Sequence, residues 1–198
     1  MEREKLYTAL SRVAWAYVFI YINFTLGTLN ILPPWVGYAL ILSALPLLAE
    51  ERRDLPLLRP LGELLLGWDF CGWLLLFLSG ITLESHFLFW DLLLTAANLY
   101  FHFQLFTDLA AIAARYQGES DAIDRRLLSC RTWVALTTTV TQLALRFLSG
   151  DALTYFTWGM GLVVVVLLLC ILPALFSLRK LFAPEAESTP EAKNPTEE

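Results

Sequence analysis

Residues 30–42 read NILPPWVGYALIL and place two adjacent prolines inside a long apolar stretch. The whole stretch, residues 13–49, is too long for one membrane-crossing helix, which needs about 20 apolar residues. Proline is tolerated in the first turn of a helix, where its missing N–H costs nothing. We therefore expect Pro33 and Pro34 to follow one helix, turn the chain and begin the next, with Gly37 allowing the two backbones to approach closely. The alternative is one long helix that is kinked at the prolines.

The composition is that of a membrane protein. Of the 198 residues, 57% are hydrophobic and 17% are charged, whereas soluble domains have about 45–50% apolar and 25% charged residues. The sequence has no basic patch with interleaved aromatic residues, so we expect no nucleic-acid partner. Cys71, Cys130 and Cys170 are too widely spaced for a disulfide framework or a cysteine metal site.

Six segments are predicted to cross the membrane as helices. They are residues 13–31, 35–49, 64–82, 87–113, 128–149 and 153–178, within a transmembrane domain at 13–182. The fifth segment is the least hydrophobic and contains TTTVT at 137–141, so we expect it to have little lipid contact. Residues 1–12 form a predicted cytoplasmic segment. The Pro- and Glu-rich tail, residues 183–198, is expected to be a disordered acidic segment in the cytoplasm.

The distribution of basic residues predicts the orientation, because cytoplasmic loops retain Lys and Arg. With six spans, 13 of the 14 basic residues fall on one side, and the exception is Arg146. The 13 are Arg3, Lys5, Arg12, Arg52, Arg53, Arg59, Arg115, Arg125, Arg126, Arg131, Arg179, Lys180 and Lys193. Both termini are therefore expected in the cytoplasm.

Polar side chains inside the predicted helices mark the candidate binding residues, because such groups are costly in a membrane. Asn98 and His102 share one face of the fourth segment with Asp91 and Thr95. We expect this face to point into the bundle, toward Gln142 and the threonines of the fifth segment. The pattern has two interpretations: hydrogen bonds that hold the helices together, or the lining of a ligand or ion pathway.

Matching depths at about 1.5 Å per residue predicts two groups of charges. Near the outer ends of the fourth and fifth segments, Asp91 and Arg146 should form an ion pair. Toward the cytoplasm, Asp69 and Asp108 lie at one depth, with Arg131 slightly nearer the surface. If these three converge, one negative charge remains that would favour a bound cation. Otherwise a carboxylate reaches the headgroup region and is solvated.

We expect no catalytic residue, no metal and no cofactor. His86 and His102, the two histidines, lie sixteen residues apart and cannot bind one metal together. The segment AEERRD at 49–54 resembles the start of an intramembrane protease signature but lacks its arginine and the later histidine motif, and is expected to form a solvated loop. GWDF at 67–70 likewise lacks the second glycine of the intramembrane aspartyl protease motif.

The stretch YINFTLGTLNILPPWVGYALIL, residues 21–42, resembles the first hairpin of small uncharacterised integral membrane proteins of Gram-positive bacteria. In those proteins Asn-Phe/Leu, Ile-Leu-Pro and Gly-Tyr recur. The resemblance implies a location in the bacterial cytoplasmic membrane and no particular activity. A six-helix chain of this size is also similar to the substrate-binding components of energy-coupling-factor vitamin transporters, although their AxxxA signature is absent from VAWAYV at 13–18.

The sequence thus predicts an all-α integral membrane protein, a six-helix transmembrane bundle with both termini in the cytoplasm. The function we expect is that of a non-catalytic component of a transport or other membrane complex. Its expected partners are the lipid bilayer and another membrane or cytoplasmic subunit. One alternative is a small permease with a polar site between the third, fourth and fifth helices, and another is an intramembrane enzyme of unrecognised type. The residues of the polar site would be Asp69, Asn98, His102, Asp108 and Gln142.

Overall fold

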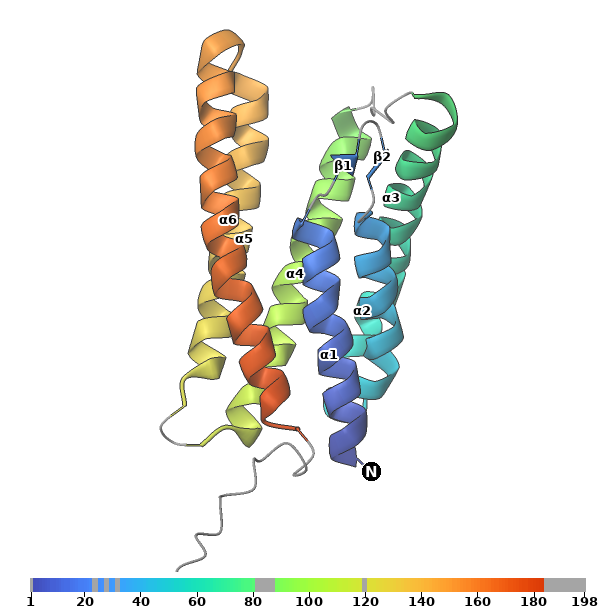
Figure 1. The fold of residues 1–198 in the computed structure, drawn as a ribbon, viewed down its shortest axis with the longest axis vertical. Coiled ribbons are helices and arrows are strands. Elements are labelled where there is room, and N and C mark those ends of the chain that lie inside the picture. The colour runs from blue at the N-terminus through green and yellow to red at the C-terminus, as the bar shows by residue number, and fades with distance from the viewer. Residues whose placement is uncertain are drawn as a thin grey trace, which may run out of the picture.

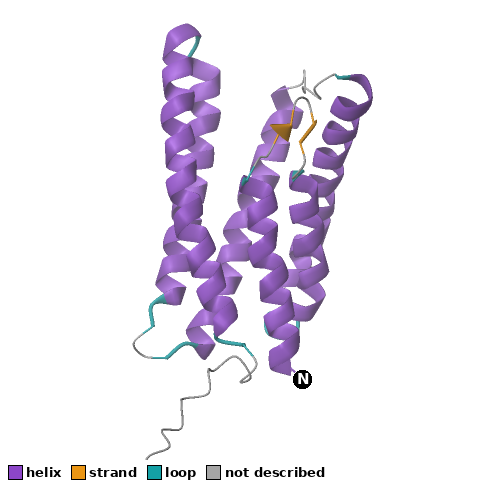
Figure 2. Cartoon of the chain, viewed as in Figure 1, coloured by secondary structure: helices purple, strands orange, loops and turns teal. Residues whose placement is uncertain are grey.

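The structure is a computed structural model that describes residues 2–22, 25–26, 29–30, 33–80, 88–118 and 121–183. Within these residues the chain is mainly helical (Figure 2), and its long helices run up and down along one axis (Figure 1). The α-helices are α1 (Glu2–Tyr21), α2 (Pro34–Leu48), α3 (Arg59–Ser79), α4 (Leu88–Tyr116), α5 (Ile123–Phe147) and α6 (Gly150–Lys180). A short 3₁₀ helix, η1 (Leu55–Leu58), precedes α3.

The prolines begin α2, as the sequence predicts. Pro34 is the first residue of the helix, and Pro33 precedes it in an extended conformation. Between α1 and α2, the two-residue strands β1 (Thr25–Leu26) and β2 (Leu29–Asn30) pair antiparallel, with Thr25 opposite Asn30. Residues 13–49 therefore form two helices and not one kinked helix.

The first helix lies about ten residues earlier than predicted. It begins at Glu2 and ends at Tyr21, whereas the sequence predicts a span at 13–31 and a separate segment at 1–12. Residues 2–12 are rich in good helix formers, and Leu6, Ala9 and Leu10 are buried in the core. Packing against the other helices thus makes residues 2–12 part of α1, although the sequence predicts a separate cytoplasmic segment there.

The close approach predicted for Gly37 is confirmed. A Cβ at this position would lie 2.6 Å from the carbonyl oxygen of Ala16 and 2.6 Å from Cγ1 of Ile20. Only a residue without a side chain allows α1 and α2 to pack at this distance.

Helices α1 to α4 pack together, and the α5–α6 hairpin leans against them at one end (Figure 1). The buried residues of α5 concentrate at 123–134 and those of α6 at 167–178, where the hairpin contacts α1 and α4. Toward the turn between Phe147 and Gly150, the hairpin stands apart from the other helices (Figure 1). The far half of the hairpin therefore exposes more of its surface than the near half.

Among the residues that the structure describes, two helical segments, Leu55–Ser79 and Gly150–Lys180, are long and apolar enough to cross a membrane. The helix α2 is also apolar but has only 15 residues. Large apolar side chains are exposed on α3, α4, α5 and α6, in a quantity that is unusual for a monomeric soluble protein. Of the predicted tail at 183–198, all residues except Ala183 lie outside the part of the chain that the structure describes.

Candidate functional site

A hydrogen-bonded polar cluster lies where α1, α2 and α4 meet. The hydroxyl of Tyr17 is 2.8 Å from Nδ1 of His102, and the hydroxyl of Tyr38 is 3.4 Å from Nε2 of the same ring. Asn98 donates an amide N–H to the Tyr38 hydroxyl over 2.8 Å. Because a tyrosine hydroxyl can donate or accept, both nitrogens of a neutral imidazole have a partner in either tautomer.

The sequence positions this cluster through helix periodicity. Asn98 and His102 are one turn apart on α4, so both face α2. Tyr17, Tyr38 and His102 are each at most 2% exposed. The ring of Tyr17 packs on Phe106 with centroids 5.2 Å apart, which fixes the position of its hydroxyl. The cluster is buried and aromatic, and its polar atoms bond to each other.

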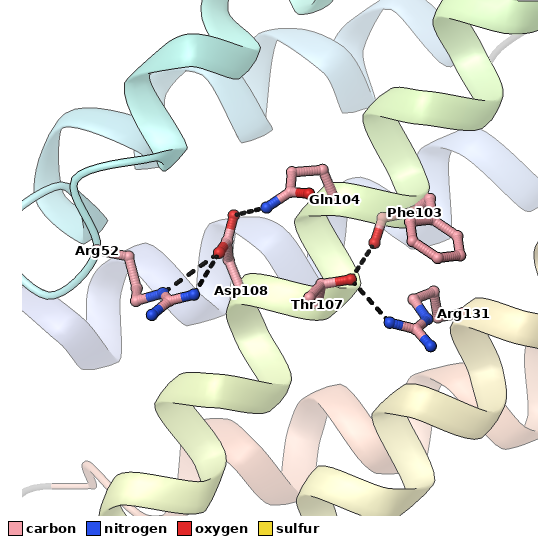
Figure 3. Close-up of polar contacts among 6 residues, drawn as sticks. All are labelled: Arg52, Phe103, Gln104, Thr107, Asp108 and Arg131. Atoms are coloured by element: carbon pink, nitrogen blue, oxygen red, sulfur yellow. Dashed lines mark hydrogen bonds and ion pairs between the residues drawn. The ribbon is translucent and has the colours of Figure 1, made fainter.

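A second polar group surrounds Asp108, whose side chain is fully buried on α4 (Figure 3). Arg52 donates through Nη2 over 3.2 Å and through Nε over 3.3 Å, both to Oδ1 of Asp108. Gln104 donates its Nε2 to Oδ2 over 3.1 Å. The carboxylate is therefore neutralised by a guanidinium and further bonded by an amide one turn away.

The arginine that neutralises Asp108 comes from the loop after α2 and not from α5. Arg131 instead donates its Nη1 to the hydroxyl of Thr107 over 3.1 Å and lies 4.3 Å above the ring of Phe103 (Figure 3). Asp108 therefore pairs with Arg52, in place of the convergence of Asp69 and Asp108 on Arg131 that was one of the two alternatives from the sequence. Sequence reasoning placed Arg52 in a solvated loop, and no spacing or depth argument linked it to Asp108.

The same loop makes a second contact with α4. Glu51 accepts from Nη1 of Arg115 over 3.0 Å and from the hydroxyl of Tyr116 over 2.8 Å. Lys5 of α1 also reaches Glu50, with 3.5 Å between Nζ and Oε1. This loop therefore connects α1, α2 and the end of α4 on the side where the N-terminus lies.

The residues predicted to line one polar site are distributed over three places. Asn98 and His102 share the aromatic cluster, and Asp69 of α3 is half-buried near Tyr38. Asp108 lies in the group with Arg52. Gln142 lines a separate cavity of about 200 Å³ between α1, α5 and α6, together with Tyr21 and the threonines at 137, 138 and 141.

The predicted outer ion pair stays a prediction. The side chain of Asp91 lies outside the described residues, so its distance to Arg146 is not defined. Within the described part of the chain, no group of three or more His, Cys, Asp or Glu side chains is arranged to hold a metal ion.

Asn98, His102, Thr107 and Asp108 of α4 each form a hydrogen bond or ion pair with a residue of a neighbouring helix or loop. In comparisons with known proteins, no family model matches this chain, and no curated protein or solved structure is significantly similar to it.

Proposed function

We propose that the chain is a six-helix integral membrane protein of the bacterial cytoplasmic membrane, and that it acts as a non-catalytic component of a membrane complex. The exposed apolar surface of α3 to α6 supports placement in a lipid bilayer. The resemblance of residues 21–42 to Gram-positive membrane proteins supports the bacterial location.

The basic residues support an orientation with both termini in the cytoplasm. The loop after α2 contains Arg52 and Arg53, whereas the described part of the connection between α5 and α6 contains no Lys or Arg. Trp158 and Tyr155 are exposed near that connection, as expected for amphipathic rings at the outer membrane interface. We place the turn between α5 and α6 on the outer side.

An apolar seam on the exposed face of α5 is the main support for a role in a complex. Its residues are Trp133, Leu136, Val140, Leu143 and Phe147, which are between 38% and 80% exposed. They recur at intervals of three and four residues, the spacing with which one helix packs along another. Within the described residues no other helix covers this seam.

The composition of α5 favours a protein partner over lipid for this seam. The helix is not among those apolar enough to cross a membrane alone, and Thr132 and Thr139 are exposed beside the seam. Their hydroxyls bond to the carbonyls of Leu128 and Ala135 in their own helix. Hydroxyl and small side chains are enriched where membrane helices pack together. We assign the seam to a transmembrane helix of a second, different subunit.

Photo-crosslinking in the native membrane tests this role. A photoreactive amino acid in place of Leu136 or Leu143 should give one discrete crosslinked band that contains a second membrane protein. Phe77, an exposed apolar residue of α3, is the matched control position and should give only a diffuse lipid background. Equal products from both helices, or a crosslink only to another copy of this chain, would contradict the proposal.

Labelling of single cysteines tests the membrane topology separately. Starting from a variant without Cys71, Cys130 and Cys170, a cysteine at Lys5 or Arg53 should react with an impermeant maleimide only after the cells are opened. A cysteine at Asp151, beside the outer turn, should react in intact cells. The reverse pattern would overturn the orientation, and release of the chain by alkaline carbonate would overturn its integral placement.

A small permease is the second candidate function. It is favoured by the cavity of about 200 Å³ between α1 and the α5–α6 hairpin, because Gln142, Tyr21 and three threonines are among the residues that line it. Under this hypothesis Gln142→Leu abolishes solute uptake by reconstituted vesicles and leaves the crosslink at Leu136 intact. If Gln142→Leu leaves both solute uptake and the crosslink at Leu136 intact, a role for this cavity in transport is excluded.

A further inference from the structure

A groove runs between α5 and α6 on the outside of the molecule. We call it the α5–α6 groove, and its volume is about 600 Å³. Its floor is made by buried Cys130, Leu167 and Ala174, and exposed Trp133 and Val166 are among the residues that border it. The small side chains of Cys130 and Ala174 leave space where larger residues would fill the contact between the two helices.

The length of the groove corresponds to one leaflet of a bilayer. On α5 it extends from Arg126 to Thr137, which at about 1.5 Å per residue is roughly 16 Å. On α6 it extends from Leu162 to Ala174, or roughly 18 Å. The hydrocarbon core of a bilayer is about 30 Å thick, so one leaflet is about 15 Å. The groove is therefore about as long as a lipid acyl chain that extends through one leaflet.

One end of the groove is cationic and the rest is largely apolar. Arg126 is exposed at the end that faces the cytoplasm in the proposed orientation, and Ser129 lies one turn further in. Within the described residues the Arg126 side chain has no acidic partner. Among the described residues, the charged groups near these ends of α5 and α6 are Asp121, Asp124, Arg125, Arg179 and Lys180, which together with Arg126 carry a net positive charge.

We propose that the α5–α6 groove binds one anionic phospholipid of the cytoplasmic leaflet. Its phosphate bonds to the Arg126 guanidinium, and one acyl chain lies along the groove between Trp133 and Val166. A guanidinium forms strong, charge-assisted hydrogen bonds with phosphate oxygens, and the apolar walls replace neighbouring lipid around the chain. The inference rests on the membrane placement proposed above but needs no partner subunit.

Lipid titration of the purified full-length chain tests the proposal. Delipidated protein in mild detergent is titrated with phosphatidylglycerol or phosphatidylcholine, and bound lipid is counted by native mass spectrometry. We expect one phosphatidylglycerol to be retained in preference to phosphatidylcholine. Arg126→Gln should weaken this retention about tenfold, as expected for loss of a hydrogen bond to a charged group. Val166→Trp, which fills the groove, should weaken the retention of both lipids.

Two internal controls locate the bound lipid. Arg53→Gln removes an exposed arginine from the loop after α2, far along the chain from the groove, and should retain phosphatidylglycerol like the wild type. Cys170 lines the groove, whereas Cys71 is exposed on α3 and does not. Phosphatidylglycerol should therefore slow alkylation of Cys170 by N-ethylmaleimide and leave Cys71 unaffected, and Arg126→Gln should remove this protection.

Several results would overturn the assignment. Equal retention by the wild type, Arg126→Gln and Val166→Trp would place the lipid elsewhere, provided that all three unfold at similar temperatures. Equal protection of Cys71 and Cys170 would indicate a non-specific lipid shell. Neither result affects the crosslink at Leu136, which tests the role in a complex separately. Failure of that crosslink alone would leave the lipid site standing.

Discussion

Arg52 and Asp108 lie 56 residues apart in the sequence, and the Nη2 atom of Arg52 contacts Oδ1 of Asp108 at 3.2 Å. The carboxylate is fully buried, whereas the Arg52 side chain is 39% exposed. The pair therefore joins a residue that cannot reach water to one that can. Because of this asymmetry, removing Arg52 and removing Asp108 should lower the free energy of unfolding by different amounts.

Arg52→Ala should destabilise the protein more than Asp108→Asn. The first change leaves a buried carboxylate with only Gln104 as a side-chain partner, at a cost of about 1.5–3 kcal/mol for a lost hydrogen bond to a charged group. The second leaves a guanidinium that can turn toward water. Thermal unfolding in detergent measures both. The double variant should be more stable than Arg52→Ala alone, and a purely additive result would contradict the direct pairing.

Tyr17→Phe should destabilise the protein by about 1–3 kcal/mol, because it leaves Nδ1 of His102 buried without its partner. Tyr21→Phe is the matched control. Tyr21 stacks on Tyr17 with ring centroids 5.9 Å apart, but its hydroxyl does not bond to His102. Equal losses of unfolding temperature in the two variants would show that ring packing, and not the hydrogen bond, gives Tyr17 its importance.

Gly37→Ala should separate α1 from α2. The added Cβ would lie 2.6 Å from a backbone oxygen, which cannot move without shifting the helix, so we expect a loss of about 1–3 kcal/mol. Gly67→Ala on α3 is the control, because its Cβ would meet nothing within 4 Å. Replacing a helical glycine by alanine there should stabilise the protein by up to about 1 kcal/mol. We therefore expect the unfolding temperature to fall in Gly37→Ala and to rise in Gly67→Ala.

Asp124→Asn should lower stability at neutral pH but not in acid. Asp124 lies in the first turn of α5, outside the predicted spans, and a hydrogen bond from the Gln117 side chain holds its pKa below the usual value of 3.8. A lowered pKa means that the carboxylate stabilises the folded chain above 3.8, and that this contribution disappears as the pH falls through the lowered pKa. The difference between wild type and variant should therefore be present at pH 7 and vanish in acid.

Gln117 allows a check of the same local structure. Its Oε1 accepts from the backbone N–H groups of Ile123 and Asp124, at 3.0 and 3.1 Å, and so caps the start of α5 from the end of α4. Gln117→Ala should remove the cap and weaken the pH dependence described for Asp124, because the backbone N–H of Arg125 still lowers the pKa of the carboxyl.

The sequence by itself determined which segments become helices and how the first hairpin is made. Apolar length predicted helices close to the observed α2, α4, α5 and α6, because helix formation depends on local composition and breakers. Pro33, Pro34 and Gly37 behave as predicted, since the missing N–H and the missing Cβ are properties of single residues. The start of α1 at Glu2 was not predicted, because it depends on burial of Leu6 and Leu10 against other helices.

Only the tertiary structure decided which polar groups meet. Helix periodicity placed Asn98 and His102 on one face, but their partners Tyr17 and Tyr38 follow from the rotation and depth of α1 and α2. Depth alone placed Arg131 near the level of Asp69 and Asp108, whereas Arg52 forms the bond to Asp108 because a loop residue can reach across from another connection. The physical reason is that a sequence defines positions along a helix axis, while the direction in which each face points is fixed by the packing of all helices together.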